Sequence, residues 1–244
     1  MLPEICHIGS FTIYSYGLML VLAFFACTYL AGLEAKKEGV NPDFIFNLCF
    51  FVFISGIIGC RIFYVFNNLN FYLRNPLEII MLQHGGMAWF GGLIFGTAAA
   101  VVFIKKNKMS LLKILDLLVP FIALGQSIGR IGCLLNGCCY GSPSEFGIYF
   151  KVFDQVLIPT QLYSSLFLLL IFLILRFMQD RKHATGQILS AYLFLYPIKR
   201  FFIEYFRNDS PRIFYGLTLF QILSLVMFSV FLLVFFKIFY DKKR

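Results

Sequence analysis

Apolar residues occur along this chain in runs that are long enough to cross a lipid bilayer. A spanning helix needs about 20 mostly apolar residues. We predict seven such helices, at Phe11–Leu33, Phe44–Phe66, Met87–Ile104, Leu111–Ile128, Leu162–Phe177, Gln187–Phe206 and Gly216–Phe239. None of these segments alternates polar and apolar residues as a membrane β-strand must. The pattern therefore predicts an all-α integral membrane protein with about seven transmembrane helices.

The distribution of Lys and Arg between the predicted helices indicates the orientation. Basic residues gather in alternate loops and at the C-terminal tail, at Lys36, Lys37, Lys105, Lys106, Lys108, Arg181, Lys182, Lys242, Lys243 and Arg244. Loops rich in Lys and Arg stay in the cytoplasm. We therefore expect a protein of the cell membrane whose N-terminus lies outside and whose C-terminus lies in the cytoplasm.

The composition supports this class and excludes several others. Of 244 residues, 60% are hydrophobic and only 14% are charged, whereas soluble domains carry about 25% charged residues. This excludes a soluble fold, a disordered chain and a small disulfide scaffold. The net charge of +9 is then explained by the orientation of the protein in the membrane and by contacts with anionic lipids, and does not indicate nucleic-acid binding. No loop is long enough for a second domain, so we expect one membrane domain over residues 1–244.

Further cations fall toward the outer half of the membrane, where orientation does not require them. Arg130 opens a run with four glycines, Gly129–Gly141, and arginine beside a tight turn is suited to binding phosphate. The alternative is an interfacial loop whose arginine extends to lipid head groups. A second cluster, Arg200, Glu204 and Arg207, has the spacing of one helix face. It indicates either an anion site or a structural ion-pair ladder.

Other residues have ordinary explanations beside the functional ones. Gly92 and Gly96 are four residues apart, as in close contacts between membrane helices. The adjacent Gly85 and Gly86, ahead of the predicted span, indicate a re-entrant turn. Trp89 is expected as an interfacial anchor, and His84 is a weak candidate for a base.

Cys133, Cys138 and Cys139 allow several interpretations. They lack the paired C-x₂-C spacing and the nearby His of a zinc site, so we expect no metal and no cofactor. A disulfide from Cys133 to either of the others, a catalytic thiol and plain small side chains all stay open, the last being favoured.

Motifs along nearly the whole chain resemble the prolipoprotein diacylglyceryl transferase family of bacterial inner membranes. The resemblance begins at Tyr16-Gly17-Leu18-Met19 and continues through Gly59–Tyr64, Asn75–Glu78, the glycine block before Ile94, Gly129–Gly141, Pro159–Tyr163, Arg200–Arg207 and Leu217–Ser224. It implies transfer of diacylglycerol from phosphatidylglycerol to the lipobox cysteine of a prolipoprotein signal-peptide region, with release of glycerol 1-phosphate. The implied site is catalytic at Tyr16, Arg130, Arg200 and Glu204, and binds phosphatidylglycerol through Arg61, Arg130, Asn136, Gly141 and Arg207.

The chain departs from the family pattern at several polar positions. Phe90 stands where the family has His, Cys133 replaces an Asn, and Cys138 replaces a Glu. Ile158 and Ser164 replace the His and Glu that flank the Pro-x-Gln-Leu-Tyr motif. Two alternatives therefore remain: transfer to an acceptor other than a lipoprotein, or a catalytically silent lipid-binding protein.

Overall fold

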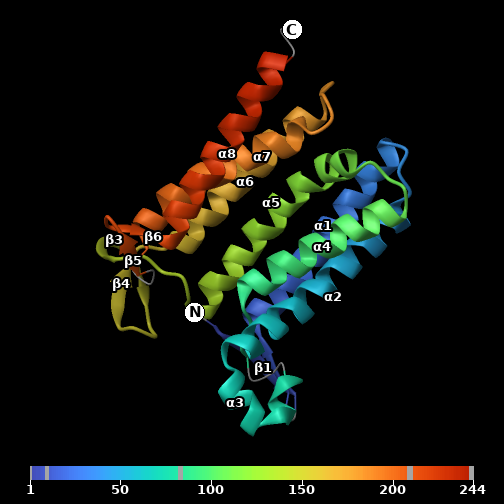
Figure 1. Cartoon of the computed structure of the whole chain (residues 1–244). Helices are drawn as coiled ribbons and strands as arrows, with labels where there is room; N and C mark the ends of the chain where they lie inside the picture. The colour runs from blue at the N-terminus through green and yellow to red at the C-terminus, as the bar shows by residue number, and fades with distance from the viewer. Residues whose placement is uncertain (1, 9–10, 82–84, 208–210, 242–244) are drawn as a thin grey trace. The chain divides into compact units, whose positions relative to one another are not determined.

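The computed structural model describes residues 2–8, 11–81, 85–207 and 211–241 (Figure 1). Most of these residues are helical, in α1 (Ser15–Lys37), α2 (Pro42–Asn67), α3 (Leu69–Arg74), the 3₁₀ turn η1 (Pro76–Ile79), α4 (Trp89–Lys106), α5 (Leu111–Asn136), α6 (Thr160–Gln179), α7 (Gln187–Tyr205) and α8 (Leu219–Asp241). Three antiparallel hairpins join β1 (Glu4–Ile8) to β2 (Phe11–Tyr14), β3 (Pro143–Phe150) to β4 (Gln155–Leu157), and β5 (Arg212–Phe214) to β6 (Leu217–Thr218).

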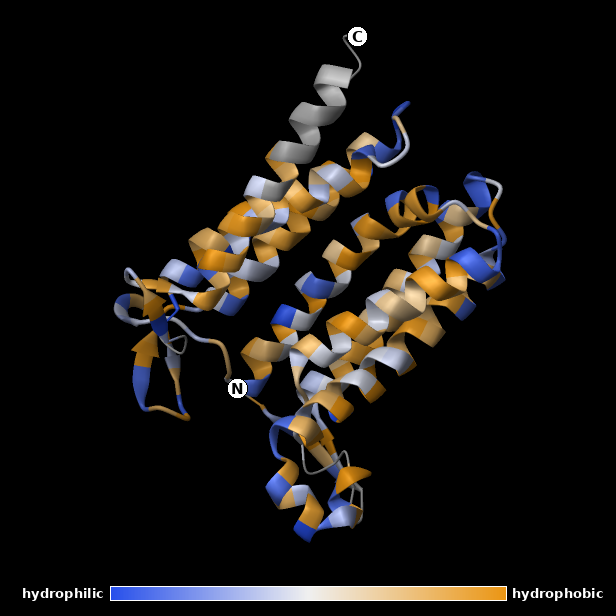
Figure 2. Ribbon diagram, in the orientation of Figure 1, coloured by the Kyte–Doolittle hydropathy of each residue, from blue (hydrophilic) through white to orange (hydrophobic). Residues whose placement is uncertain are grey.

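Within the described residues, α1, α2, α4, α5 and α6 are long and apolar enough to cross a membrane. Hydrophobic residues run along these helices, and hydrophilic residues are more frequent near their ends (Figure 2). Many large apolar side chains on them are exposed, such as Phe25, Phe50 and Leu170, as expected where lipid replaces water. An all-α integral membrane protein is thus confirmed.

The first predicted span differs from the structure at its start. Phe11–Tyr14 forms strand β2, which pairs with β1, and α1 begins at Ser15. The backbone amide and the hydroxyl of Ser15 both donate to the carbonyl of Pro3. Strands therefore occur in this protein, but as short hairpins next to helix ends and not as membrane strands.

The glycine-rich run after the fourth predicted span is also different from the expected loop. Helix α5 continues to Asn136, so Gly129, Arg130 and Gly132 are helical. A Cβ on Gly132 would lie 3.0 Å from Cβ of Met19. Glycine at this position therefore lets α1 approach α5 closely, as small residues do in membrane helix packing.

The chain divides into two compact units, residues 31–114 and residues 1–30 with 115–244. In the first unit α2 packs against α4. A Cβ on Gly91 would lie 2.1 Å from the carbonyl oxygen of Gly59, so only glycine fits at this crossing. Gly92 faces Cys60 and Gly96 faces Val52, which confirms their predicted packing role.

In the second unit, the buried core joins α5, α6 and α7 through Val119, Ala123, Ile171, Leu175 and Ile188. Polar contacts supplement it: the Ser127 hydroxyl donates to the carbonyl of Ser165 at 2.8 Å. The carboxylate of Asp116 accepts from the backbone amides of Gly186 and Leu189 at the start of α7. This capping explains a buried acid within an apolar helix.

Candidate active site

The last turns of α7 carry a buried carboxylate between two guanidinium groups. Oε2 of Glu204 lies 3.0 Å from a terminal nitrogen of Arg200 and 3.6 Å from one of Arg207. Glu204 is 1% exposed and Arg200 is 7% exposed. The spacing predicted that these three side chains would share one helical face; Arg200 and Glu204 do so, while Arg207 follows the end of α7 and still pairs with Glu204.

One residue of β6 and one of the first turn of α8 complete the surroundings of this cluster. The Thr218 hydroxyl donates to Oε1 of Glu204 at 3.3 Å, and the ring of Phe220 lies 4.3 Å from the Arg200 guanidinium carbon. Side chains that are held from several directions lose little further freedom when a ligand binds. The arginines are therefore oriented before any substrate arrives.

Arg130 lies on the last turns of α5 and has no hydrogen bond or salt bridge to any residue that the structure describes. Its charge nevertheless acts on Lys199 and Arg200 of α7 and on Tyr16 of α1. The ring of Tyr16 lies against Gly132, two residues after Arg130 in α5. Residues far apart in the sequence thus converge here, as the family resemblance implied.

Lys199 is a further cation of this cluster, and the sequence analysis did not select it as a site residue. It is 5% exposed, and its ammonium group has no hydrogen-bond partner among the described residues. Its ammonium nitrogen lies 5.1 Å from the centre of the Tyr196 ring. A buried cation without an acceptor is unfavourable unless a ligand supplies one. The sequence indicated a role for Lys199 only through its position next to Arg200, in the predicted outer half of the membrane.

The two glycines of the turn after α5, Gly137 and Gly141, have different roles. Gly137 has φ of 75° and reverses the chain. Gly141 pairs with Arg207 in a β-bridge, and a Cβ there would lie 2.7 Å from the carbonyl oxygen of Phe206. Asn136 ends α5, and the Cys138 thiol donates to the carbonyl of Cys133, five residues earlier in the chain. Through the contact of Gly141 with Arg207, the turn after α5 packs against the end of α7.

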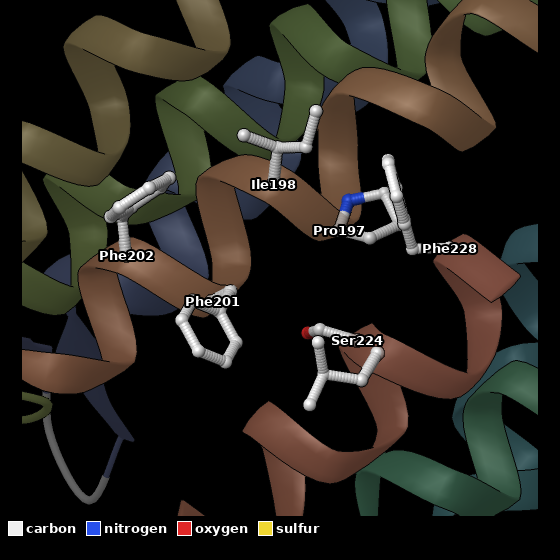
Figure 3. A pocket seen from close by; sticks show the side chains of 7 residues that line it. Pro197, Ile198, Phe201, Phe202, Ser224 and Phe228 are labelled. Carbon is white, nitrogen blue, oxygen red and sulfur yellow. The ribbon is translucent and has the colours of Figure 1, made fainter.

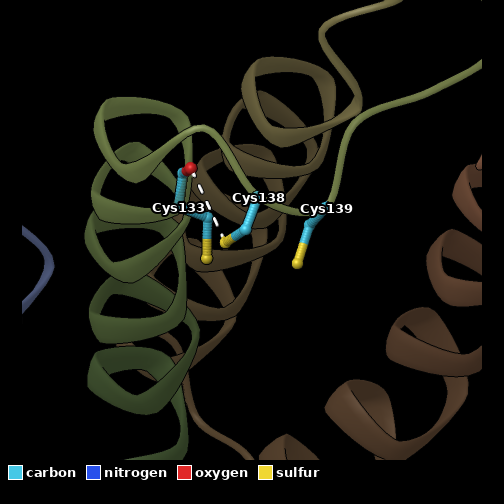
Figure 4. A group of neighbouring side chains, drawn as sticks. All are labelled: Cys133, Cys138 and Cys139. Atoms are coloured by element: carbon cyan, nitrogen blue, oxygen red, sulfur yellow. Dashed lines mark hydrogen bonds between the residues drawn. The ribbon is translucent and has the colours of Figure 1, made fainter. Parts of the chain in front are cut away.

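Three thiols gather in this turn (Figure 4). The sulfur atoms of Cys133, Cys138 and Cys139 all lie within 4.8 Å of one another, and all three are free thiols. We call this group the thiol cluster. Hydrogen bonds from the other two thiols lower the pKa of Cys139, and the positive charges of Arg207 and Arg130 act in the same direction.

Arg61 belongs to the other compact unit and is fully engaged there. Its five N–H groups donate to the backbone carbonyls of Glu78, Ile79, Met81, Gly85 and Gly86. These bonds use every donor of a guanidinium group. In this structure Arg61 organises the loop between α3 and α4, including the predicted glycine turn, where Gly85 and Gly86 have φ of 78° and 80°.

No described side chain takes the place of the family's histidine. Phe90 lies on the first turn of α4 with its ring edge-to-face against Trp89, and Trp89 is largely exposed, as an interfacial anchor is. His84, the weak candidate for a base, lies outside the described residues.

An apolar groove runs between α7 and α8 (Figure 3). Its volume of about 160 Å³ is lined by Pro197, Ile198, Phe201, Phe202, Ser224, Leu225 and Phe228. Its one hydroxyl, on Ser224, donates to the carbonyl of Phe220. The groove can accommodate a hydrocarbon chain and offers nothing for a phosphate.

Comparison with known proteins gives a single answer. A family model described as prolipoprotein diacylglyceryl transferase matches residues 3–237. A phosphatidylglycerol–prolipoprotein diacylglyceryl transferase of Clostridium tetani is 35% identical over 87% of each chain. One of Clostridium perfringens, numbered 2, is 37% identical over 84% of this chain and 83% of its own. One of Lactobacillus acidophilus is 32% identical over 93% of this chain and 86% of its own. The chain is a member of the prolipoprotein diacylglyceryl transferase family.

Proposed function

We propose that this protein transfers the diacylglyceryl group of phosphatidylglycerol to the thiol of a prolipoprotein lipobox cysteine. The cysteine sulfur attacks the glycerol carbon that joins the diacylglycerol to the phosphate. A carbon–sulfur bond forms and the carbon–oxygen bond to phosphate breaks. Its electron pair leaves with glycerol 1-phosphate, and the thiol proton goes to solvent or a base.

The observation that carries this proposal is the excess of positive charge in a buried site. Arg130, Arg200, Arg207 and Glu204 all act electrostatically on Lys199, and Glu204 also pairs with Arg200 and Arg207. Among the described residues of this cluster, four basic side chains thus lie around one carboxylate. A phosphodiester brings one negative charge, and the phosphate monoester that leaves carries more. The site therefore stabilises the leaving group more strongly than the substrate, which lowers the barrier.

Each cation has a distinct place in this scheme. Arg130 and Lys199 have no hydrogen-bond acceptor among the described residues, so their donors are free to bind phosphate oxygens. Arg200 shares its guanidinium group between Glu204 and the ligand. Glu204 acts as a positioning residue that fixes Arg200 and Arg207. Tyr16, next to Gly132, contacts the substrate from α1.

Three further residues shape the site. Gly141 lets the turn after α5 approach the end of α7, and Asn136 orients the turn. Arg61, whose donors are all bonded to backbone carbonyls, holds the glycine turn at Gly85 and Gly86 within its own unit, and its role in phosphatidylglycerol binding is to position this turn.

The acceptor thiol must ionise before it attacks. A free cysteine with a pKa of about 8.5 is only a few per cent thiolate at neutral pH. Phe90 cannot remove a proton, so the cationic field of the site favours the thiolate in place of a dedicated base.

We place this chemistry at the outer face of the bacterial inner membrane. One domain of seven spans, with α7 and α8 added to the five apolar helices, brings the N-terminus outside and the C-terminus into the cytoplasm. The lysines at the end of α1 and of α4 then lie in the cytoplasm, as basic loops do. Arg130 and Arg200 face the outer leaflet, where the signal-peptide region of a prolipoprotein arrives.

A second candidate is transfer from phosphatidylglycerol to a different nucleophile, favoured by the loss of polar groups at Phe90 and Ile158. Purified protein with labelled phosphatidylglycerol and a lipobox peptide separates the two. Thioether product supports the first proposal. Release of glycerol 1-phosphate without lipopeptide, in the presence of other membrane acceptors, supports the second. If neither product forms, the protein is a silent lipid-binding protein.

A further inference from the structure

We propose that the thiol cluster is a binding site for one thiophilic d¹⁰ cation, Zn²⁺ or Cu⁺. Cys133, Cys138 and Cys139 supply three sulfur ligands from the end of α5 and the turn that follows (Figure 4). The site forms whether or not the chain transfers lipid, because it depends only on the geometry of this turn.

The distances between the sulfur atoms fit such a cation. All three lie within 4.8 Å of one another. Three thiolates on a metal with bonds of about 2.3 Å would lie about 3.8–4.0 Å apart, so closure needs shifts of less than about 1 Å. Rotation of the cysteine side chains supplies shifts of this size without moving the backbone.

The backbone that carries these sulfurs is fixed from several sides. Cys139 has φ of 65°, an uncommon conformation for a residue with a side chain. The Thr160 hydroxyl donates to its carbonyl at 2.6 Å, and the Gln161 amide donates to the carbonyl of Cys138 at 2.7 Å. The amide of Cys138 donates to the carbonyl of Cys133 at 3.1 Å. Such bonds hold ligands in place in metal sites.

The surroundings also suit the charge of a metal–thiolate group. Three thiolates with a monovalent or divalent cation leave two or one negative charges. Arg130 and Arg207 act electrostatically on Cys139 and compensate for that charge. Soft sulfur ligands favour Cu⁺ and Zn²⁺ over Mg²⁺ or Ca²⁺. No His, Asp or Glu in the described ranges joins the three sulfurs, so a divalent ion would keep one position open for water.

Binding would replace protons in a balanced way. Each thiol that is protonated beforehand releases its proton when its sulfur binds the cation, and no oxidant or reductant is needed. A disulfide between two of the three cysteines is the competing outcome, since it removes two ligands at once.

The test uses full-length protein purified in detergent without oxygen and with a reductant that lacks thiols. Zn²⁺ and Cu⁺ are each titrated against a chromophoric chelator, and we expect one cation per chain. Cys139→Ser should weaken binding by more than about 100-fold, the upper end of the effect of losing an outer partner alone. The double variant Cys6→Ser, Cys60→Ser, at cysteines away from the cluster, should bind like the unchanged protein.

A second measurement needs no variant and so is independent of any folding defect. The unchanged protein is alkylated with and without Zn²⁺ or Cu⁺, and each cysteine is followed by mass spectrometry. We expect the cation to protect Cys133, Cys138 and Cys139 and to leave Cys6 reactive. Equal alkylation of the three with and without cation, a disulfide among them in the reduced protein, or binding that survives Cys139→Ser would overturn the proposal.

Discussion

Glu204→Gln tests most directly whether the charge of Glu204 positions Arg200 and Arg207. The glutamine keeps the size of the side chain and can still accept from Thr218, whose hydroxyl lies 3.3 Å from Oε1. It removes the negative charge that Glu204 places beside the two arginines, whose terminal nitrogens lie 3.0 Å (Arg200) and 3.6 Å (Arg207) from Oε2. The change therefore isolates the contribution of the charge.

The magnitude follows from the burial of the pair. Glu204 is 1% exposed and Arg200 is 7% exposed, so water cannot replace the lost partner. Removing one member of a buried ion pair lowers the free energy of unfolding by about 3–5 kcal/mol. The freed arginines also lose their fixed orientation, so we expect the KM for phosphatidylglycerol to rise.

The assay combines urea unfolding in mixed micelles with transfer kinetics over a range of pH. Glu38→Gln is the matched control, because Glu38 is exposed and its contact with Lys113 is 3.9 Å long. Exposed pairs of this kind contribute about 0–1 kcal/mol, so the control should change neither stability nor KM. A Glu204→Gln protein with normal stability and lipid binding, but with a displaced pH optimum, would identify Glu204 as a proton-transfer base and refute the positioning role.

Three further outcomes are expected. Lys199→Met should raise the KM for phosphatidylglycerol at least about tenfold, since a hydrogen bond to a charged group contributes about 1.5–3 kcal/mol; it should also raise the urea midpoint because a buried, unpartnered charge is gone. Lys151→Met, in an exposed turn, should do neither, and an unchanged KM in both would exclude Lys199 from the site. Gly141→Ala should destabilise the protein, because its Cβ would lie 2.7 Å from a carbonyl oxygen, whereas Gly129→Ala meets nothing within 4 Å and should be tolerated in thermal unfolding. Replacing the thiol cluster by serines should preserve transfer, and a diacylglyceryl adduct on any of its cysteines in mass spectrometry would contradict this.

The parts of the site that lie on one helix could be predicted from the sequence. Arg200 and Glu204 are four residues apart, and helical geometry alone places them on one face of α7, whereas Arg207 follows the end of the helix and still reaches Glu204. The membrane class likewise follows from the length of the apolar runs. In both cases a local rule decides the outcome.

The parts that depend on contacts between elements could not be predicted. Thr218 reaches Glu204 only because the hairpin before α8 folds back onto α7, and Lys199 is distinguished by its burial and not by its spacing. The glycines of Gly129–Gly141 indicated a loop, but Gly129 and Gly132 lie in α5, and close packing against α1 favours glycine at Gly132. The three sulfurs converge because Gly137 and Cys139 reverse the chain, which the spacing of the cysteines does not reveal.

The central claim is that one cluster of cations binds the phosphate of phosphatidylglycerol while a lipobox thiol takes its diacylglyceryl group. The most direct measurement is thioether formation by purified protein given labelled phosphatidylglycerol and a lipobox peptide. The claim predicts labelled lipopeptide together with glycerol 1-phosphate, and a loss of about 100-fold or more in the rate for Arg130→Ala or Arg200→Ala, in line with the removal of a donor to a developing negative charge. Absence of lipopeptide from folded protein, or full activity in either variant, would contradict it.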